Sequence, residues 1–321
     1  MKKLTTLFGA VALLVSTTLF AQEWPAKQPI RMVVGYPPGG SADALARDLI
    51  PSLSKALGQQ VILDYKPGAG GAIGADTVSK ATPDGYTIGL LDNGPMTVQG
   101  NFRKLPFDPV TGFTPITGVG KLPFVLLANP QLPAQTLNDI IKLAKSKPGS
   151  LAYSSSGQGS SHHISGEMFK NMTKTHIVHI PYRGAAPALV DLIGGQVQLS
   201  FATMVPSLPF IQNNQVRPIA VTSLKRSAIL PNVPTLDELG IKGFDSQGWF
   251  AIFAPPNLPP AITAKLVAAF KTTFEDPVLM AKPSMKGSDL MTGTPDQLLA
   301  TVKAENAMIA KLIKDQNITA D

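Results

Sequence analysis

Cysteine is absent from this chain of 321 residues, so the fold has no disulfide bonds and no cysteine can carry a lipid anchor. Charge is also scarce. Only 15% of the residues are charged, and the basic residues behind the formal net charge of +7 are scattered along the sequence. This distribution does not indicate a nucleic-acid surface. The motifs of a P-loop and of a hydrolase nucleophile elbow are missing as well.

Long apolar runs are missing except at the N-terminus. There, the stretch from Leu4 to Phe20 follows Lys2 and Lys3, and Ala21 precedes polar residues. A basic start, an apolar stretch of this length and a small residue at its end are typical of a secretory signal peptide. We therefore expect residues 1–21 to be cleaved and the mature protein to lie in the periplasm, not embedded in the membrane.

The pattern of the remaining chain predicts an α/β fold. Strand-like apolar runs alternate with helical patterns, giving strands at Ile30–Val34, Val61–Tyr65 and Tyr86–Leu91 and helices at Ala44–Leu57 and Ala72–Ala81. Alternation of this kind is typical of a mostly parallel sheet flanked by helices. Pro51 lies inside the first helical pattern, so we expect a kink or a break there.

The length of the chain favours two domains, and a second set of strands and helices follows the first. The expected strands of the second half are Ile116–Val119, Phe124–Leu127, Leu151–Ser154, Ile177–Ile180 and Val197–Phe201. We expect Lys104–Thr114 and Arg217–Thr222 to carry the chain between the domains. The predicted division is residues 22–103 plus 222–321 for the first lobe and residues 104–221 for the second.

Loops of small residues follow several of the predicted strands. Pro37-Pro38-Gly39-Gly40 comes after the first strand, Gly68-Ala69-Gly70 after the second, and Asn93 lies in the loop after the third. In doubly wound sheets, ligands bind at the carboxyl ends of strands, and free backbone N–H groups at helix starts favour anions. These loops therefore predict an anion-binding site, although each loop taken alone is also explained as a tight turn.

A serine–histidine enzyme is a weaker alternative. Ser155 or Ser160 lies near His162 and His163 in the sequence, but no orienting acid is evident. Adjacent histidines point to different sides of a helix start, which is poor geometry for a metal site. We expect these histidines to be hydrogen-bonded residues, and we expect no metal and no cofactor. The loop after the second strand also lacks the third glycine of a dinucleotide-binding motif.

Two charged residues have alternative roles. Arg183 lies in a strand-end loop, where it would pair with a ligand carboxylate or form a salt bridge at the surface or between the domains. Asp43 would cap the start of its helix through backbone N–H groups, hydrogen-bond a ligand, or do both. For Trp249, a place in the core is favoured over the wall of a cleft.

Seven segments together carry a family resemblance. They are Pro37-Pro38-Gly39-Gly40-Ser41-x-Asp43, Pro67-Gly68-Ala69-Gly70-Gly71-x-Ile73-Gly74, Thr82-Pro83-Asp84-Gly85-Tyr86-Thr87, Leu105-Pro106-Phe107-Asp108-Pro109, Tyr153-Ser154-Ser155-Ser156-Gly157-Gln158-Gly159, Pro181-Tyr182-Arg183-Gly184 with Pro187-Ala188-Leu189, and Leu230-Pro231-Asn232-Val233-Pro234-Thr235. In this order, and over essentially the whole mature chain, they resemble the Bug (TctC-like) periplasmic solute receptors of tripartite tricarboxylate transporters.

The resemblance implies a two-lobed, flytrap-like periplasmic binding fold with a small carboxylate between the lobes. With the loops described above, it gives as ligand-binding candidates Tyr36, Pro38, Gly39, Gly40, Ser41, Asp43, Ala69, Gly70 and Asn93 in the first lobe, and Ser155, Gly157, Ser160, His163, Tyr182, Arg183, Gly184, Ala185 and Ala186 in the second. Ala202 and Gln198 stand where many members have acidic residues. Ser161-His162 stands where a proline or another polar pair is common, so the second-lobe side of the site is the less defined.

On this basis we expect a non-enzymatic receptor for a di- or tricarboxylate or an aromatic acid. The resemblance implies that it delivers this ligand to membrane transporter subunits, which it contacts transiently, and we expect a monomer without a nucleic-acid partner. A ligand sensor for a signalling partner is an alternative, because the same closed clamp would serve either role. The serine–histidine hydrolase is the less favoured alternative.

Overall fold

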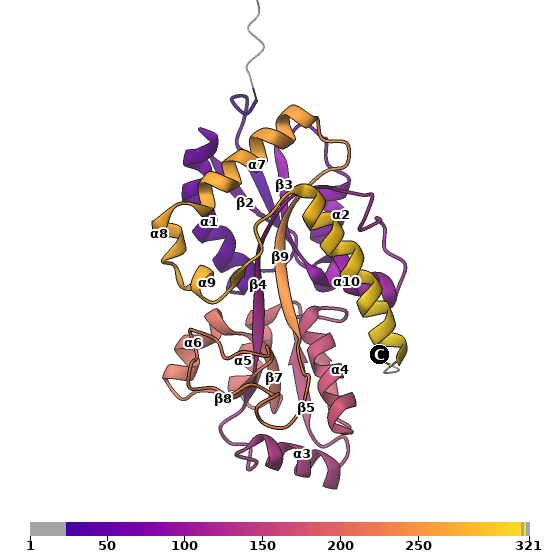
Figure 1. Ribbon diagram of the computed structural model, residues 1–321. Coiled ribbons are helices and arrows are strands. Elements are labelled where there is room, and N and C mark those ends of the chain that lie inside the picture. The colour runs from indigo at the N-terminus through magenta and orange to yellow at the C-terminus, as the bar shows by residue number, and fades with distance from the viewer. Residues whose placement is uncertain (1–23, 316–317, 319–321) are drawn as a thin grey trace, which may run out of the picture.

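Two lobes joined by two long strands make up the molecule (Figure 1). The computed structural model describes residues 24–315 and 318, so the predicted signal peptide lies outside the described residues. The joining strands are β4 (Thr114–Ala128) and β9 (Gln247–Ala254). Each lobe is a sheet flanked by helices, which confirms the predicted α/β class. Within the described residues, no helix combines the length and the apolar character that a membrane crossing needs.

The first lobe is built on a sheet in which the strand order is β2 (Val61–Tyr65), β1 (Ile30–Val34), β3 (Thr87–Asp92), β9 and the first part of β4. β1 pairs in parallel with β2 and β3, whereas β9 runs antiparallel to β3 and β4. The short β10 (Asp289–Leu290) pairs with β4. The helices of this lobe are α1 (Ser41–Leu57), α2 (Ala72–Ser79), α7 (Pro260–Phe274), α8 (Pro277–Met280), α9 (Pro283–Lys286) and α10 (Pro295–Asp315), with short turns η1 (Ala69–Gly71), η2 (Gly94–Val98) and η3 (Gln99–Asn101).

In the second lobe, the later part of β4 pairs antiparallel with β7 (Leu199–Thr203) and β8 (Arg217–Val221). β5 (Ala152–Ser155) lies parallel between β7 and β6 (Val178–Pro181). The helices are α3 (Leu137–Ser146), α4 (Ser161–Thr173), α5 (Ala185–Ile193) and α6 (Met204–Gln212). Both sheets are mixed rather than mostly parallel, because β4 and β9 run antiparallel to the strands beside them.

The chain crosses between the lobes at other places than the sequence predicts. The strands expected at Ile116–Val119 and Phe124–Leu127 form one continuous strand, β4, which pairs with β9 in its first part and with β7 and β8 in its last part. Arg217–Thr222 does not return the chain to the first lobe, because β8 pairs with β4 in the second sheet. The segment that follows still packs there, with Leu236 and Phe244 fully buried in the second-lobe core. The chain returns to the first lobe through β9, which pairs with β3 and β4 there.

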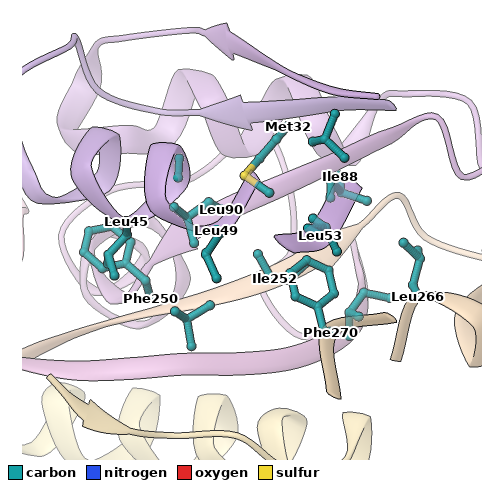
Figure 2. Packing of buried hydrophobic residues seen from close by; sticks show 14 of the residues in the cluster. Met32, Leu45, Leu49, Leu53, Ile88, Leu90, Phe250, Ile252, Leu266 and Phe270 are labelled. Carbon is teal, nitrogen blue, oxygen red and sulfur yellow. The ribbon is translucent and has the colours of Figure 1, made fainter. Parts of the chain in front are cut away.

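Helix α1 covers one face of the first sheet and sets the position of the loop before it. Leu45, Leu49 and Leu53 recur at helical spacing and pack against Met32, Ile88 and Ile252 of the sheet and Phe270 of α7 (Figure 2). The helix begins at Ser41, three residues before the predicted start, and Pro51 does not end it. Pro51 is exposed, so the Arg47 carbonyl that loses its helical partner lies on the solvent side.

Candidate functional site

A cavity lies between the two lobes. It is partly open to solvent, and the empty space between its lining residues, counted with the solvent at its mouth, is about 340 Å³. The first lobe contributes the loop between β1 and α1 with the start of α1, the end of β3 and one residue of β9. The second lobe contributes the loop before α4 with the start of α4, the start of α5 and the end of β7. The lining residues are Tyr36, Pro37, Gly40, Ser41, Ala42, Asp92 and Phe250 from the first lobe, and Ser156, His162, Ala185 and Thr203 from the second.

Two helices from different lobes begin at this cavity. α1 starts at Ser41 after Gly40, and α5 starts at Ala185 after Gly184; neither helix has a side-chain cap. Uncapped first-turn N–H groups and the helix dipole favour an anion at such a start. The start of α4 differs, because the Ser160 hydroxyl accepts a hydrogen bond from its backbone. The site therefore has two backbone anion-binding elements that face each other from separate lobes.

Ser41 adds a side-chain donor at the same place. Its hydroxyl oxygen is buried and has no hydrogen-bond partner within the described residues. A buried hydroxyl without a partner is unfavourable, so a bound ligand that accepts its proton would be stabilised there.

Asp92 brings a carboxyl group into the cavity from the end of β3. The Tyr36 hydroxyl donates to Asp92 Oδ2 over 2.8 Å, and the Gly94 backbone N–H also donates to this carboxyl. Burial nevertheless raises the pKa of Asp92 to about 7, because the charged form loses its solvent. The pKa of Tyr36 is raised well above its usual value by its own burial and then by the charge of Asp92.

Ser156 and His162 supply the polar groups of the second lobe. Ser156 Oγ lies 2.7 Å from His162 Nδ1, and Ser156 also hydrogen-bonds the Tyr36 hydroxyl. The imidazole packs against Phe124, with ring centres 4.3 Å apart. Burial lowers the pKa of His162 to about 4, so the ring is neutral near pH 7, and its Nε2 has no partner among the described residues. Asp92, Tyr36, Ser156 and His162 thus form one hydrogen-bonded chain that crosses from lobe to lobe.

The lobes touch beside the cavity, as expected for a closed conformation. A Cβ on Gly184 would lie 2.8 Å from Pro37 Cδ, and a Cβ on Gly70 would lie 2.9 Å from the Gln158 carbonyl oxygen. The Ser161 hydroxyl of α4 donates to the side chain of Asn93 in the first lobe. Glycines at these points allow the two backbones to approach closely.

The structure brings about half of the predicted site residues together. Tyr36, Gly40, Ser41 and Ala185 line the cavity. Around it, at the contact between the lobes, lie Gly39, Gly70, Asn93, Gly157, Gly184 and Ala186. An outer groove beside the loops, which shares Pro37 with the cavity, includes Pro38, Ala69 and Arg183.

Five other predicted residues have their side chains engaged elsewhere. The Asp43 carboxylate accepts the Gly39 N–H and pairs with Arg47 and Tyr65. Tyr182 donates to Asp191 over 2.7 Å, and Ser160 caps α4. His163 is fully buried and stacks on His179, and Ser155 hydrogen-bonds that same His179.

Several cavity residues were not among the predicted ones. They are Asp92, Ser156, His162, Thr203 and Phe250, whereas Pro37 and Ala42 lie within the motif Pro37–Asp43 that carries the predicted first-lobe contacts. Asp92 and Thr203 end strands β3 and β7, so the rule that ligands bind at carboxyl ends of strands would have found them. Phe250 lies within β9, and no sequence signal marks it.

The serine–histidine pairs differ from those considered in the sequence. The structure pairs Ser155 with His179 and Ser156 with His162, and neither imidazole has a carboxylate partner in the described part of the chain. The orienting acid of a catalytic triad is therefore missing from both pairs. Across residues 24–315 and 318, no three His, Asp or Glu side chains come together in a way that would hold a metal ion.

Comparison with known proteins finds similar chains along nearly the whole length. A family model described as the tripartite tricarboxylate transporter family receptor, TctC, matches residues 45–318. BugT of Bordetella pertussis is 33% identical over 319 residues, which cover 97% of this chain and 98% of BugT.

Solved structures show the same likeness. Rpa4515 of R. palustris, solved with adipate, has a TM-score of 0.88 and 33% identity, covering 92% of this chain and 99% of its own. MatC (Rpa3494) from Rhodopseudomonas palustris, solved with bound malate, has a TM-score of 0.84 and 28% identity, covering 90% and 99%. The likeness to solved periplasmic binding proteins confirms the predicted two-lobed fold class.

Proposed function

Because the chain belongs to the tripartite tricarboxylate transporter receptor family, we propose that it is a periplasmic solute receptor. It binds a small carboxylate between its lobes and delivers this ligand to a membrane transporter of the same type. It does so as a monomer and without catalysis or a cofactor. The ligand class to be tested first includes di- and tricarboxylates and aromatic acids.

The observation that carries this proposal is the pair of uncapped helix starts, α1 and α5, that meet at one cavity between the lobes. No lysine or arginine is among the cavity-lining residues, so backbone N–H groups and the Ser41 hydroxyl are the groups that favour an anion there. Solved relatives that hold malate and adipate support a carboxylate as the ligand. The missing orienting acid supports a receptor over a hydrolase.

A calorimetric comparison of acids with their amides tests the proposal. The mature protein is first screened by thermal shift against mono-, di-, tri- and aromatic carboxylates, because a ligand of the native state raises the melting temperature. The acid that binds is then titrated beside its uncharged amide. Each buried helix start favours the anion by about 1–2 kcal/mol, so we expect the amide to bind at least about tenfold more weakly. Equal affinities for acid and amide would contradict the proposal.

A further inference from the structure

The cavity has unequal polar surroundings. Two uncapped helix starts and the free Ser41 hydroxyl offer hydrogen-bond donors for an anion. Asp92 is the only charged side chain among the cavity-lining residues. Its negative charge repels an anion and favours a hydrogen-bond donor or a cation. A ligand that fills this cavity therefore meets both donors for a carboxylate and one buried carboxyl group.

Asp92 retains room for another donor. An ionised carboxylate has about four acceptor positions, and the Tyr36 hydroxyl, the Gly94 N–H and the backbone N–H of Asp92 itself use three of them. The exposed fraction of Asp92 is only 8%. A second carboxylate close to such a group is unfavourable, since like charges repel strongly where solvent is excluded. A hydroxyl or ammonium group, in contrast, would complete its hydrogen bonds.

We propose that Asp92 selects a ligand with one carboxylate and, elsewhere on the molecule, a hydrogen-bond donor such as a hydroxyl or ammonium group, in preference to a dicarboxylate of the same length. This inference rests on the proposed function, the binding of a small carboxylate, and places monocarboxylates that carry a second donor ahead of di- and tricarboxylates. The carboxylate lies at the starts of α1 and α5, and the donor faces Asp92. Asp92 is thereby a specificity-determining residue of the site.

The pKa of Asp92 gives this preference a dependence on pH. Two titratable groups face Asp92: Tyr36 of the β1–α1 loop, and His162 of α4 through Ser156. The pKa of Tyr36 is well above its usual value and that of His162 is about 4, so neither changes charge between about pH 6 and pH 8. The pKa of Asp92, about 7, lies within this interval. Protonation of Asp92 removes the repulsion and allows a second carboxyl group.

The test is a calorimetric series with matched ligands on the mature protein. Dicarboxylates of three to six carbons are compared with the ω-hydroxy and ω-amino monocarboxylates of the same length at about pH 8. We expect the hydroxy or amino acid to bind at least about tenfold more tightly than the dicarboxylate. Comparing the hydroxy acid with the amino acid shows whether the preferred donor is a hydroxyl or an ammonium group. In Asp92→Asn, the dicarboxylate should gain affinity and the amino acid should lose it. Asp289→Asn, which removes an exposed carboxylate on β10, is the control. In this variant the order of the ligand affinities should be that of the unmutated protein.

A second measurement does not depend on a variant. Lowering the pH from about 8 to about 6 should tighten dicarboxylate binding by the unmutated protein and weaken binding of the amino acid. If the dicarboxylate binds most tightly at pH 8 and the ranking is the same at both pH values, the role of Asp92 is wrong while the receptor proposal stands. If no carboxylate binds at all, both proposals are wrong.

Discussion

Asp92 affects both the stability of the protein and the ligand preference of its site. Its carboxyl group is held in the cavity at the end of β3, and burial raises its pKa from 3.8 to about 7. Between these values the folded protein holds a proton that the unfolded chain has lost. The contribution of Asp92 to the free energy of unfolding therefore falls as the pH rises from about 4 to about 7, and is constant above that range.

Replacing Asp92 by asparagine should remove this dependence. We expect the free energy of unfolding of Asp92→Asn, relative to the unmutated protein, to increase with pH over that range by up to about 4 kcal/mol. The lowered pKa values of His162 and His179 act in the opposite direction, but they do so in both proteins and cancel in the difference. Urea denaturation of both proteins at several pH values measures this difference in the free energy of unfolding. A difference that stays constant with pH would contradict the buried, protonated Asp92.

At the level of single residues, the sequence predicts where backbone groups lie better than where side chains point. The β1–α1 loop could be placed at the site because glycines, a strand end and a helix start define it locally. Asp43 and Tyr182 lie in the expected loops, but each finds a partner close in sequence, Arg47 and Asp191, that directs it away from the cavity. That choice depends on side-chain packing, which a single sequence does not reveal.

Among the elements, the loops before α1 and α5 meet most closely. Gly184 has a φ of +132°, and a Cβ there would lie 2.8 Å from Pro37 Cδ on the other lobe. Gly240 provides a matched comparison, because its φ is +101° and a Cβ there would have nothing within 4 Å. An alanine at either position strains the backbone, but only the one at position 184 also pushes against the other lobe.

We therefore expect Gly184→Ala to hinder closure and Gly240→Ala to leave it intact. Ligand shifts a hinged receptor toward its closed state by its higher affinity for that state. With the carboxylate identified by calorimetry, Gly184→Ala should bind at least about tenfold more weakly and show a smaller decrease in the radius of gyration by X-ray scattering. Equal behaviour of the two variants, or no compaction of the unmutated protein, would contradict closure.

The elements themselves were predictable where their pairing is local. The strand–loop–helix units of both lobes follow from apolar runs and glycine loops. The crossings between the lobes were predicted at the wrong places because the joining strands pair with partners far away in the sequence. β4 pairs with β9 more than a hundred residues later, and nothing in the apolar run of β8 indicates that it stays in the second sheet. Sequence periodicity identifies a strand but not its neighbour.

For the whole molecule, the N-terminal segment predicts export and processing. Lys2, Lys3 and the apolar run to Phe20 should direct the chain through the inner membrane, with cleavage near Ala21. Mass spectrometry of the periplasmic fraction should find a mature chain that starts at or near Gln22. A cytoplasmic protein that retains Met1 would contradict both the processing and the periplasmic location.

The place of β9 in the first sheet also governs the order in which the protein can fold. β9 lies between β3 and β4, yet it begins only at Gln247, after all the strands of the second sheet have been synthesised. Until then, the edge of β3 on which β9 pairs is free, and β4 is not joined to the group formed by β2, β1 and β3. Pairings between such distant segments form slowly. A nascent chain with this topology therefore stays incomplete until its last quarter supplies the strand that completes the first lobe.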